Sequence, residues 1–426
     1  MLFRSMTDTV AHHVLAHNYD QTLALSLLQM DAAAEIDQHA RFMSDLEAKG
    51  KLDRKVEGLP DALALAERKQ AGKALTRPEL AVLLAYGKLD LFEDIIASRA
   101  PDDPYFFRTL EGYFPKPLSK YRDAMKHHRL RREIIATVVD NELVNMCGPT
   151  FPQRLRAAAG GDTAALVIGF TAARQVQRID EVWGKVAALD GQAPAEGQMA
   201  LFKELAYILR GQTFWLARRA ARDNATVQGL IDAYRPAVDE LKTLVPQILS
   251  PFEQKAAARR GSDFVKAGAP KELAHQIALL RPLTTASDLV ELANASSWSV
   301  TNVARLYHQV GANFGFDRLR SAAGSQAAGD AFERLAVRRL VEDMLAEQTQ
   351  LTQAIMKFVA NAQAGEDAEH AKAAVQSWAA LHPAPVKAAK QTVEEIEDAN
   401  AKGGAGWTFA KLTIANAALR ELAVQA

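Results

Sequence analysis

Apolar side chains recur at intervals of three and four residues along most of the chain, and runs that alternate at period two are almost absent. The first spacing places apolar side chains on one face of an α-helix, whereas the second would indicate a strand. Ala, Leu, Glu, Lys, Arg and Gln dominate the chain, and these residues favour helix over sheet. The pattern therefore predicts an all-α fold, a multi-helix bundle with no Rossmann sheet.

The clearest helix start lies at Thr76, Pro78 and Glu79. Thr76 can accept a hydrogen bond from an early helical amide, Pro78 loses no donor that the helix needs, and Glu79 completes a capping box. One face of the helix that follows carries Leu80, Leu83, Leu84 and Leu91. A second start of this kind is Asp102-Asp103-Pro104.

A longer helix is expected from about Ser119 to Met146, because Gly148 and Pro149 then stop it. Its core-facing stripe would consist of Leu130, Ile134, Val138, Val139 and Leu143.

The first strong break between modules is Gly160-Gly161, where Asp162 or Thr163 can cap the next helix. We therefore predict two domains, an N-terminal helical module over residues 1–159 and a C-terminal helical bundle over 160–426. Within the second, a helix is expected from Met199 to Arg222.

From Phe332 to Phe358 neither Gly nor Pro interrupts the chain. An alternating four and three spacing, typical of a short coiled-coil seam, links Val337, Val341, Met344, Gln348, Leu351, Ile355 and Phe358. The closing helix carries Leu412, Ala415 and Leu419 on one side. The chain is thus expected to end in a coiled-coil-like helical hairpin.

Composition narrows the class of protein. The 426 residues include 51 basic and 51 acidic side chains, and 49% of all residues are hydrophobic, which excludes a disordered chain. No run of about 18 apolar residues predicts a membrane span. One cysteine, Cys147, cannot form an internal disulfide, so a reducing, cytoplasmic location is expected. The zero net charge argues against a nucleic-acid or lipid binder.

His13 and His17 stand one helical turn apart and Asp20 follows, a spacing that metal sites use. A zinc hydrolase would need a Glu beside the first His, and two ligands do not complete a site. A half-exposed helix face is the simpler interpretation, and a small metalloenzyme is kept as a third hypothesis.

The densest basic run extends from Lys126 to Arg132 and could contact phosphate. Asp123 and Glu133 flank it, and helical geometry would spread its side chains around the axis. We expect an ion-paired face. A free-standing helical module that binds nucleic acid through this run is the alternative hypothesis.

Gly403-Gly404-Ala405-Gly406 is the richest glycine cluster, but it lacks the preceding strand and the acidic residue of a dinucleotide site. Cys147 is expected to be a small buried residue. Since no Walker loop, nucleophile elbow or metalloprotease motif occurs, we assign no catalytic, cofactor-binding or metal-binding residue.

Several segments together resemble one family, the large bacterial NAD-specific glutamate dehydrogenases, in the helical region that follows their catalytic domain. The segments that carry the resemblance are Leu75 to Tyr86, Asp103-Pro104-Tyr105, Tyr113-Phe114-Pro115, His128 to Thr137, and Asn141 to Asn145. Residues 1 to 30 resemble the point at which the family's chain leaves the dehydrogenase domain. The resemblance covers nearly the whole chain and is most specific up to about Arg156.

The resemblance implies a non-catalytic C-terminal region that gives structural, assembly or regulatory support. The whole enzyme would convert L-glutamate, NAD and water to 2-oxoglutarate, ammonium and NADH, and its NAD would be held outside this chain. Implied partners are the dehydrogenase part of the same enzyme and further copies in a homo-oligomer. Some apolar side chains near the start should then lack cover within this chain, among Leu2, Phe3, Val10, Val14 and Leu25.

Overall fold

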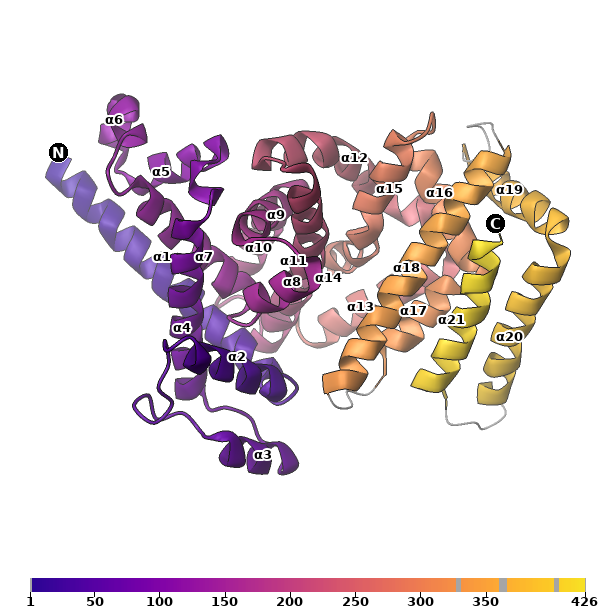
Figure 1. The fold of residues 1–426 in the computed structure, drawn as a ribbon. Coiled ribbons are helices and arrows are strands. Elements are labelled where there is room, and N and C mark those ends of the chain that lie inside the picture. The colour runs from indigo at the N-terminus through magenta and orange to yellow at the C-terminus, as the bar shows by residue number, and fades with distance from the viewer. Residues whose placement is uncertain (1, 327–330, 360–365, 402–405, 426) are drawn as a thin grey trace. The chain divides into compact units, whose positions relative to one another are not determined.

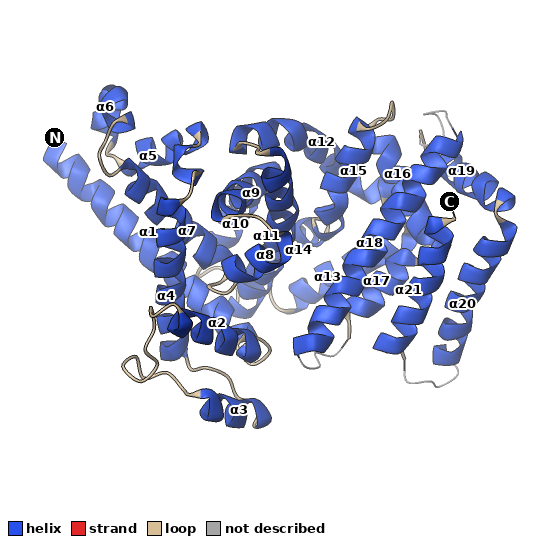
Figure 2. Ribbon diagram, in the orientation of Figure 1, coloured by secondary structure: helices blue, strands red, loops and turns tan. Residues whose placement is uncertain are grey.

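The computed structural model describes residues 2–326, 331–359, 366–401 and 406–425. Within these ranges every regular element is a helix, so the predicted all-α class is confirmed (Figure 2). The chain divides into two compact units, unit 1 with Met1–Arg235 and Ala267–Ala269, and unit 2 with Pro236–Lys266 and Pro270–Ala426. The boundary that the sequence predicts at residues 159 and 160 lies inside unit 1, and its division of the chain stays a prediction.

The helices of unit 1 are α1 (Leu2–Asp31), α2 (Ile36–Ala48), α3 (Ala62–Gln70), α4 (Arg77–Ala97), α5 (Phe107–Tyr113), α6 (Arg122–Lys126), α7 (Arg131–Cys147), α8 (Phe151–Ala159), α9 (Thr163–Val176), α10 (Ile179–Ala187) and α11 (Ala195–Asp223). Short 3-10 turns occupy Ala100–Asp102, Pro104–Phe106 and Lys116–Tyr121. The next helix, α12 (Val227–Ile248), begins in unit 1 and continues into unit 2.

The remaining helices of unit 2 are α13 (Pro251–Lys266), α14 (Lys271–Ala278), α15 (Ala286–Asn294), α16 (Val300–Phe314), α17 (Phe316–Gly324), α18 (Ala331–Val359), α19 (Ala368–Leu381), α20 (Pro383–Ala401) and α21 (Phe409–Val424). A 3-10 turn occupies Arg281–Thr285. Figure 1 shows α18, α21 and α20 side by side near the C-terminus, and α21 contacts both of the others.

Two of the helix starts predicted in unit 1 are confirmed, and the third, at Asp102-Asp103-Pro104, begins a 3-10 turn that leads into α5. The Thr76 amide donates to Glu79 Oε2 over 2.6 Å, which completes the capping box of α4. Asp162 accepts from the Ala165 amide over 2.8 Å and caps α9. Each bond satisfies a backbone donor that the first turn of a helix leaves unpaired.

The single helix expected from Ser119 to Met146 is wrong. Side chains of the basic run interrupt it, because His127 Nδ1 lies 2.8 Å from the Asp123 carbonyl oxygen and the Leu130 amide donates to His128 Nδ1. Such local bonds compete with the helical hydrogen bonds. The chain therefore folds as a 3-10 turn, α6 and α7, and Leu130 is 43% exposed instead of joining the stripe.

Helix α9 forms the centre of unit 1. All of its residues from Ala164 to Ala173 are buried, so no side of the helix faces water along that stretch. The closest neighbour is α11, where a Cβ built on Gly169 would lie 2.6 Å from Ala217 Cα. Only a glycine at 169 allows the two backbones to approach this closely.

The seam predicted in α18 is confirmed in its middle and wrong at its end. Met344, Gln348, Leu351 and Ile355 are all fully buried. Phe358 is 42% exposed, and the helix ends one residue later. The closing helix α21 packs on α18 and α20, with Leu412, Ala415 and Leu419 buried as predicted.

A buried polar network joins four helices of unit 2. Glu253 Oε2 accepts from the Ser250 amide at the start of α13 and lies 2.7 Å from His308 Nδ1 on α16. Arg320 of α17 lies 3.8 Å from the other Glu253 oxygen and also bonds Gln348 of α18. Burial alone would raise the pKa of Glu253, but His308, Arg320 and the Ser250 amide hold it at about 2.

We predict that Gly169→Ala destabilises the protein by about 2 kcal/mol or more, because the new methyl group would overlap the α11 backbone. The matched control is Gly184→Ala in α10, since a Cβ there meets no atom within 4 Å. This control should stabilise the protein by about 0.5 to 1 kcal/mol through helix propensity. Urea unfolding gives the free energy of unfolding of both variants. If Gly169→Ala raised this free energy as Gly184→Ala does, the result would contradict the close packing of α9 on α11.

We predict that Leu351→Asp destabilises unit 2 by about 3 kcal/mol or more, because a carboxylate would replace a fully buried leucine. The control is Gln353→Asp, two residues along the same helix and exposed. Thermal unfolding should separate the two variants clearly. Equal melting temperatures would show that α18 does not bury this face.

We predict that Glu253 makes the protein sensitive to acid. Its pKa of about 2 lies below the ordinary value of 4.5, so its stabilising effect is complete above about pH 5 and is lost as the pH falls toward 2. The loss is on the order of 3 kcal/mol. Glu253→Gln should flatten this part of the curve of unfolding free energy against pH, whereas Glu394→Gln, at an exposed position, should leave it unchanged.

Candidate functional site

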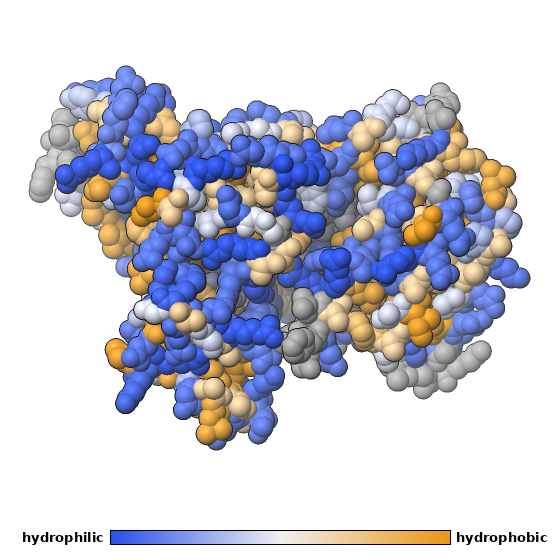
Figure 3. Space-filling model, in the orientation of Figure 1, coloured by the Kyte–Doolittle hydropathy of each residue, from blue (hydrophilic) through white to orange (hydrophobic). Residues whose placement is uncertain are grey.

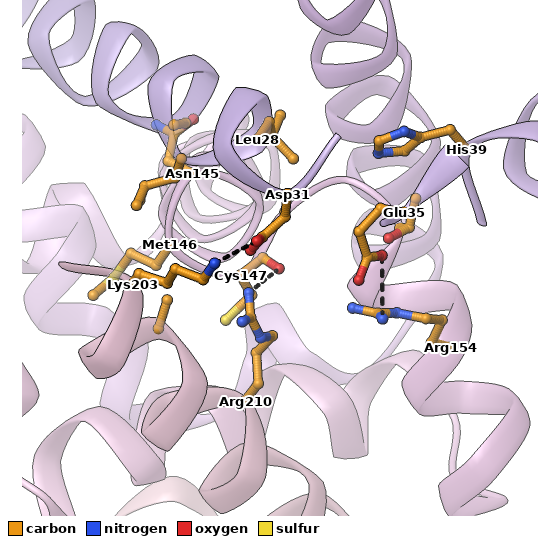
Figure 4. A pocket seen from close by; sticks show the side chains of 15 residues that line it. Leu28, Asp31, Glu35, His39, Asn145, Met146, Cys147, Arg154, Lys203 and Arg210 are labelled. Atoms are coloured by element: carbon orange, nitrogen blue, oxygen red, sulfur yellow. Dashed lines mark hydrogen bonds and ion pairs between the residues drawn. The ribbon is translucent and has the colours of Figure 1, made fainter. Parts of the chain in front are cut away.

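A small cavity of about 60 Å³ lies in unit 1, where the C-terminal end of α1 meets α2, α7, α8 and α11 (Figure 4). The local fold places these walls. Gly148 ends α7 with a φ of 92°, a left-handed conformation that favours glycine, and the chain then turns into α8. The lining is rich in ionisable side chains, unlike the apolar core around it.

Two ion pairs bound the cavity. Lys203 of α11 pairs with Asp31, the last residue of α1, and its ammonium lies close to that carboxylate. Arg154 of α8 lies 3.5 Å from Glu35, which precedes α2. Figure 4 shows the two pairs on opposite sides of the cavity.

Arg210 lies between these pairs and differs from them. Its guanidinium donates one long hydrogen bond of 3.5 Å to the Cys147 carbonyl oxygen. Among the described residues it forms no ion pair within 4 Å, although its side chain is half-buried. A guanidinium has five donors, so most of its capacity is unused here.

Two buried polar side chains also line this cavity with unused hydrogen-bonding atoms. His39 is 1% exposed, and burial together with the charge of Arg154 lowers its pKa to about 4. Its Nδ1 has no hydrogen-bond partner in the described part of the chain. The same holds for Oδ1 of Asn145, which is 9% exposed.

The sequence analysis did not identify this cavity. A signal was present, because Asp31, Glu35 and His39 follow a four-residue spacing and Lys203 and Arg210 lie seven residues apart on one helix. Each spacing alone is also typical of a solvated helix face. Only the fold brings the two sets together.

A second group of charges, of which Asp140 is buried and Lys88 half-buried, lies where α1 contacts α4 and α7. Lys88 of α4 interacts electrostatically with Asp140 of α7 and Asp20 of α1. Burial lowers the pKa of Lys88 to about 8 and raises the pKa of Asp140 to about 7. Asp20, which the sequence analysis considered together with His13 and His17, thus lies near Lys88.

The histidines considered as metal ligands do not converge. His13 is exposed, and His17 lies 2.7 Å from the Gln21 side chain through its Nε2 atom. In the described ranges no three His, Cys, Asp or Glu side chains form a group that could hold a metal ion. The exposed side of α1 is thus the better description of these residues.

Three of the four Lys and Arg side chains in the run from Lys126 to Arg132 form ion pairs, with two acidic side chains. Arg131 and Arg132 both pair with Asp102, and Arg132 also donates to the carbonyl oxygens of Ile96 and Ser98 over 2.7 and 2.6 Å. Lys126 lies 3.6 Å from Asp123. Arg131 and Arg132 thus join the start of α7 to the end of α4 and the segment that follows it, in keeping with the predicted ion-paired face.

Cys147 and the glycine cluster are the remaining features that the sequence analysis considered. Cys147 is buried, and burial raises its pKa to about 12, which makes the thiol unreactive. Gly403, Gly404 and Ala405 lie outside the described residues. No helix in the described ranges is long and apolar enough to span a membrane.

The N-terminal half of α1 exposes apolar side chains. Val10, Val14 and Leu15 are 59%, 51% and 69% exposed. Figure 1 shows this end of α1 projecting from unit 1, and Figure 3 shows hydrophobic surface along its edge. Leu25, in the second half, packs against the core, while the side chains of Leu2 and Phe3 lie outside the description.

Comparison with known proteins gives one consistent result. The sequence profile of the family described as "Glutamate dehydrogenase, C-terminal" matches residues 72–421. The NAD-specific glutamate dehydrogenase of Halomonas elongata is 33% identical over 396 residues, which are 93% of this chain and 24% of that protein. The protein of the same name from Pseudomonas aeruginosa is 33% identical, over 99% of this chain and 25% of its own length.

A more distant relative, the NAD-specific glutamate dehydrogenase of Mycobacterium tuberculosis, is 26% identical over 94% of this chain and 24% of its own length. The chain thus spans about a quarter of the length of the curated relatives that it matches. Since the family profile covers most of the residues, this chain belongs to the glutamate dehydrogenase C-terminal family.

Proposed function

We propose that this chain is the non-catalytic C-terminal helical region of an NAD-dependent glutamate dehydrogenase. The complete enzyme would oxidise L-glutamate with NAD and water to 2-oxoglutarate, ammonium and NADH. The chain corresponds to about a quarter of each relative, so three quarters of such an enzyme remain for cofactor and substrate. In this proposal, the helical region supports the folding and assembly of that larger part.

The way in which proteins bind NAD supports the proposal that the cofactor binds outside this chain. A Rossmann site holds the pyrophosphate of NAD at a turn between a strand and a helix. The described residues form helices and their connections only.

The observation that carries the proposal is the exposed apolar side of α1 at Val10, Val14 and Leu15. Neighbouring apolar side chains exposed on one helix indicate a surface that a partner covers. The second half of α1 is anchored by contacts with α4, α7 and α11. A helix anchored at one end and uncovered at the other is suited to join this region to the dehydrogenase part.

We further propose that the complete enzyme is a cytoplasmic homo-oligomer in which this region contributes subunit contacts. Its single, buried Cys147 is consistent with a reducing compartment. Equal numbers of acidic and basic residues remove long-range repulsion between copies of the chain.

We predict that the dehydrogenase part, expressed together with this chain, co-purifies with it through a tag on either piece. Val10→Asp with Val14→Asp should weaken the association at least tenfold, because each carboxylate would enter an apolar contact. The control is Asn18→Asp, which adds one carboxylate at an exposed polar position of α1. Equilibrium binding of the purified pieces gives the dissociation constants.

The dehydrogenase part should also melt at a higher temperature in the complex, since a partner that binds only the folded form stabilises it. A dehydrogenase part that is fully stable and active alone, and does not associate with this chain, would contradict the proposal. Equal affinities for the double variant and the control would place the contact elsewhere than on α1.

A further inference from the structure

The segment from Phe107 to Leu130 carries a local excess of positive charge. It contains six Lys or Arg residues and two acidic ones, whereas the whole chain contains 51 of each kind. The segment comprises α5, the 3-10 turn Lys116–Tyr121, α6 and the turn into α7, and we call it the basic segment. Such a concentration of one sign of charge on a neutral chain favours an anionic partner.

Aromatic rings hold the basic segment together as one compact piece. Arg122 and Lys126, one turn apart on α6, lie 5.5 and 5.0 Å from the ring centroid of Phe107 at the start of α5. After α5, the ring of Phe114 packs edge-to-face with that of His128, and their centroids are 5.6 Å apart. These contacts bring the cations of α6 and of the turn after it against α5.

Three cations of the basic segment are not neutralised. Its two acidic side chains pair with Arg122 and Lys126. Lys116, Lys120 and Arg129 are exposed and form no ion pair within 4 Å with any residue that the structure describes. Ammonium and guanidinium groups of this kind form charge-assisted hydrogen bonds with carboxylates. A carboxylate can bind here without first displacing an acidic side chain of the chain itself.

Exposed apolar surface accompanies these cations. Tyr113, Tyr121 and Leu130 are 47%, 53% and 43% exposed. Tyrosine and arginine side chains are enriched in protein–protein interfaces, where they contribute much of the binding energy. Figure 1 shows α6 at the outer edge of unit 1, where a partner can reach it. The basic segment thus combines charge and contact area on one accessible part of the unit.

The rings of the segment favour an acidic polypeptide over a single-stranded nucleic acid. Proteins that bind single strands stack the bases on the faces of aromatic side chains. Here the Lys120 ammonium already lies 5.0 Å from the ring centroid of Tyr121, and two cations lie over Phe107. The equal numbers of acidic and basic residues in the whole chain also remove the long-range attraction to a polyphosphate.

We propose that the basic segment is a docking surface for an acidic stretch of another polypeptide, whose carboxylates pair with Lys116, Lys120 and Arg129. Tyr121 and Leu130 contact the apolar side chains next to these carboxylates. The inference goes beyond the proposed function, because it concerns α5, α6 and the turns beside them and not the exposed side of α1. It does not depend on a contact with the dehydrogenase part.

Hexaglutamate, capped at both ends, is the probe for the test, which uses the full 426-residue chain. Fluorescence anisotropy of the labelled peptide at low ionic strength should show saturable binding, and capped hexaglutamine should not bind. In protein labelled with ¹⁵N-histidine, the ring signals of His127 and His128 should shift along the same saturation curve. Those of exposed His13 on α1 should stay unchanged.

The triple variant Lys116→Gln, Lys120→Gln and Arg129→Gln should raise the dissociation constant for hexaglutamate about tenfold or more, since three ion pairs are lost. The matched control replaces three exposed lysines elsewhere in unit 1, as Lys55→Gln, Lys73→Gln and Lys185→Gln. Both triple variants have the same net charge, so the comparison separates the basic segment from the overall charge. Circular dichroism verifies that both are folded.

Three results would overturn the proposal. One is the absence of saturable hexaglutamate binding to the wild-type chain at low ionic strength, which needs no variant to interpret. Another is an equal affinity of the two triple variants, because binding would then follow the overall charge. The third is tighter binding of a 5′-phosphorylated oligothymidylate of six nucleotides through the same three cations, which would assign the segment to nucleic acid. None of these readouts involves dehydrogenase activity or the contact proposed for α1.

Discussion

Unit 1 depends on the burial of α9 from all sides. A helix without a water-facing side must find apolar partners around its whole circumference, and its strongest contact is the close approach to α11 at Gly169 and Ala217. Helix α11 buries Leu201, Leu205 and Leu209 in the core and carries Lys203 and Arg210 to the cavity. The geometry of the cavity therefore follows from the packing of these two helices.

In unit 2, buried polar contacts join helices to one another. Glu253, His308, Arg320 and Gln348 come from four different helices and bond one another within the core. A buried network of this kind is unfavourable unless nearly every member is satisfied. It thereby favours one arrangement of α13, α16, α17 and α18 over alternatives that an apolar core would tolerate.

Helix α1 contributes to two different features of unit 1. Its N-terminal half exposes Val10, Val14 and Leu15, which the proposed dehydrogenase partner would cover, and its C-terminal end supplies Asp31 to the cavity. Between them, Asp20 interacts with the half-buried Lys88. One helix thus carries the proposed partner surface at one end and a wall of the cavity at the other.

The sequence by itself determined the helical class, the starts of α4 and α9, the middle of the α18 seam and the resemblance to the family, because each depends on neighbouring residues or on a pattern within one helix. The break at His127 to Leu130, the exposure of Phe358 and the ion pair of Glu347 with Arg420 were decided by tertiary structure. The cavity was decided there too, since its walls come from α1, α2, α7, α8 and α11, which meet only after these helices have packed. Helical periodicity shows which face of a helix is apolar, but the partner of a charged side chain depends on contacts between residues far apart in the chain.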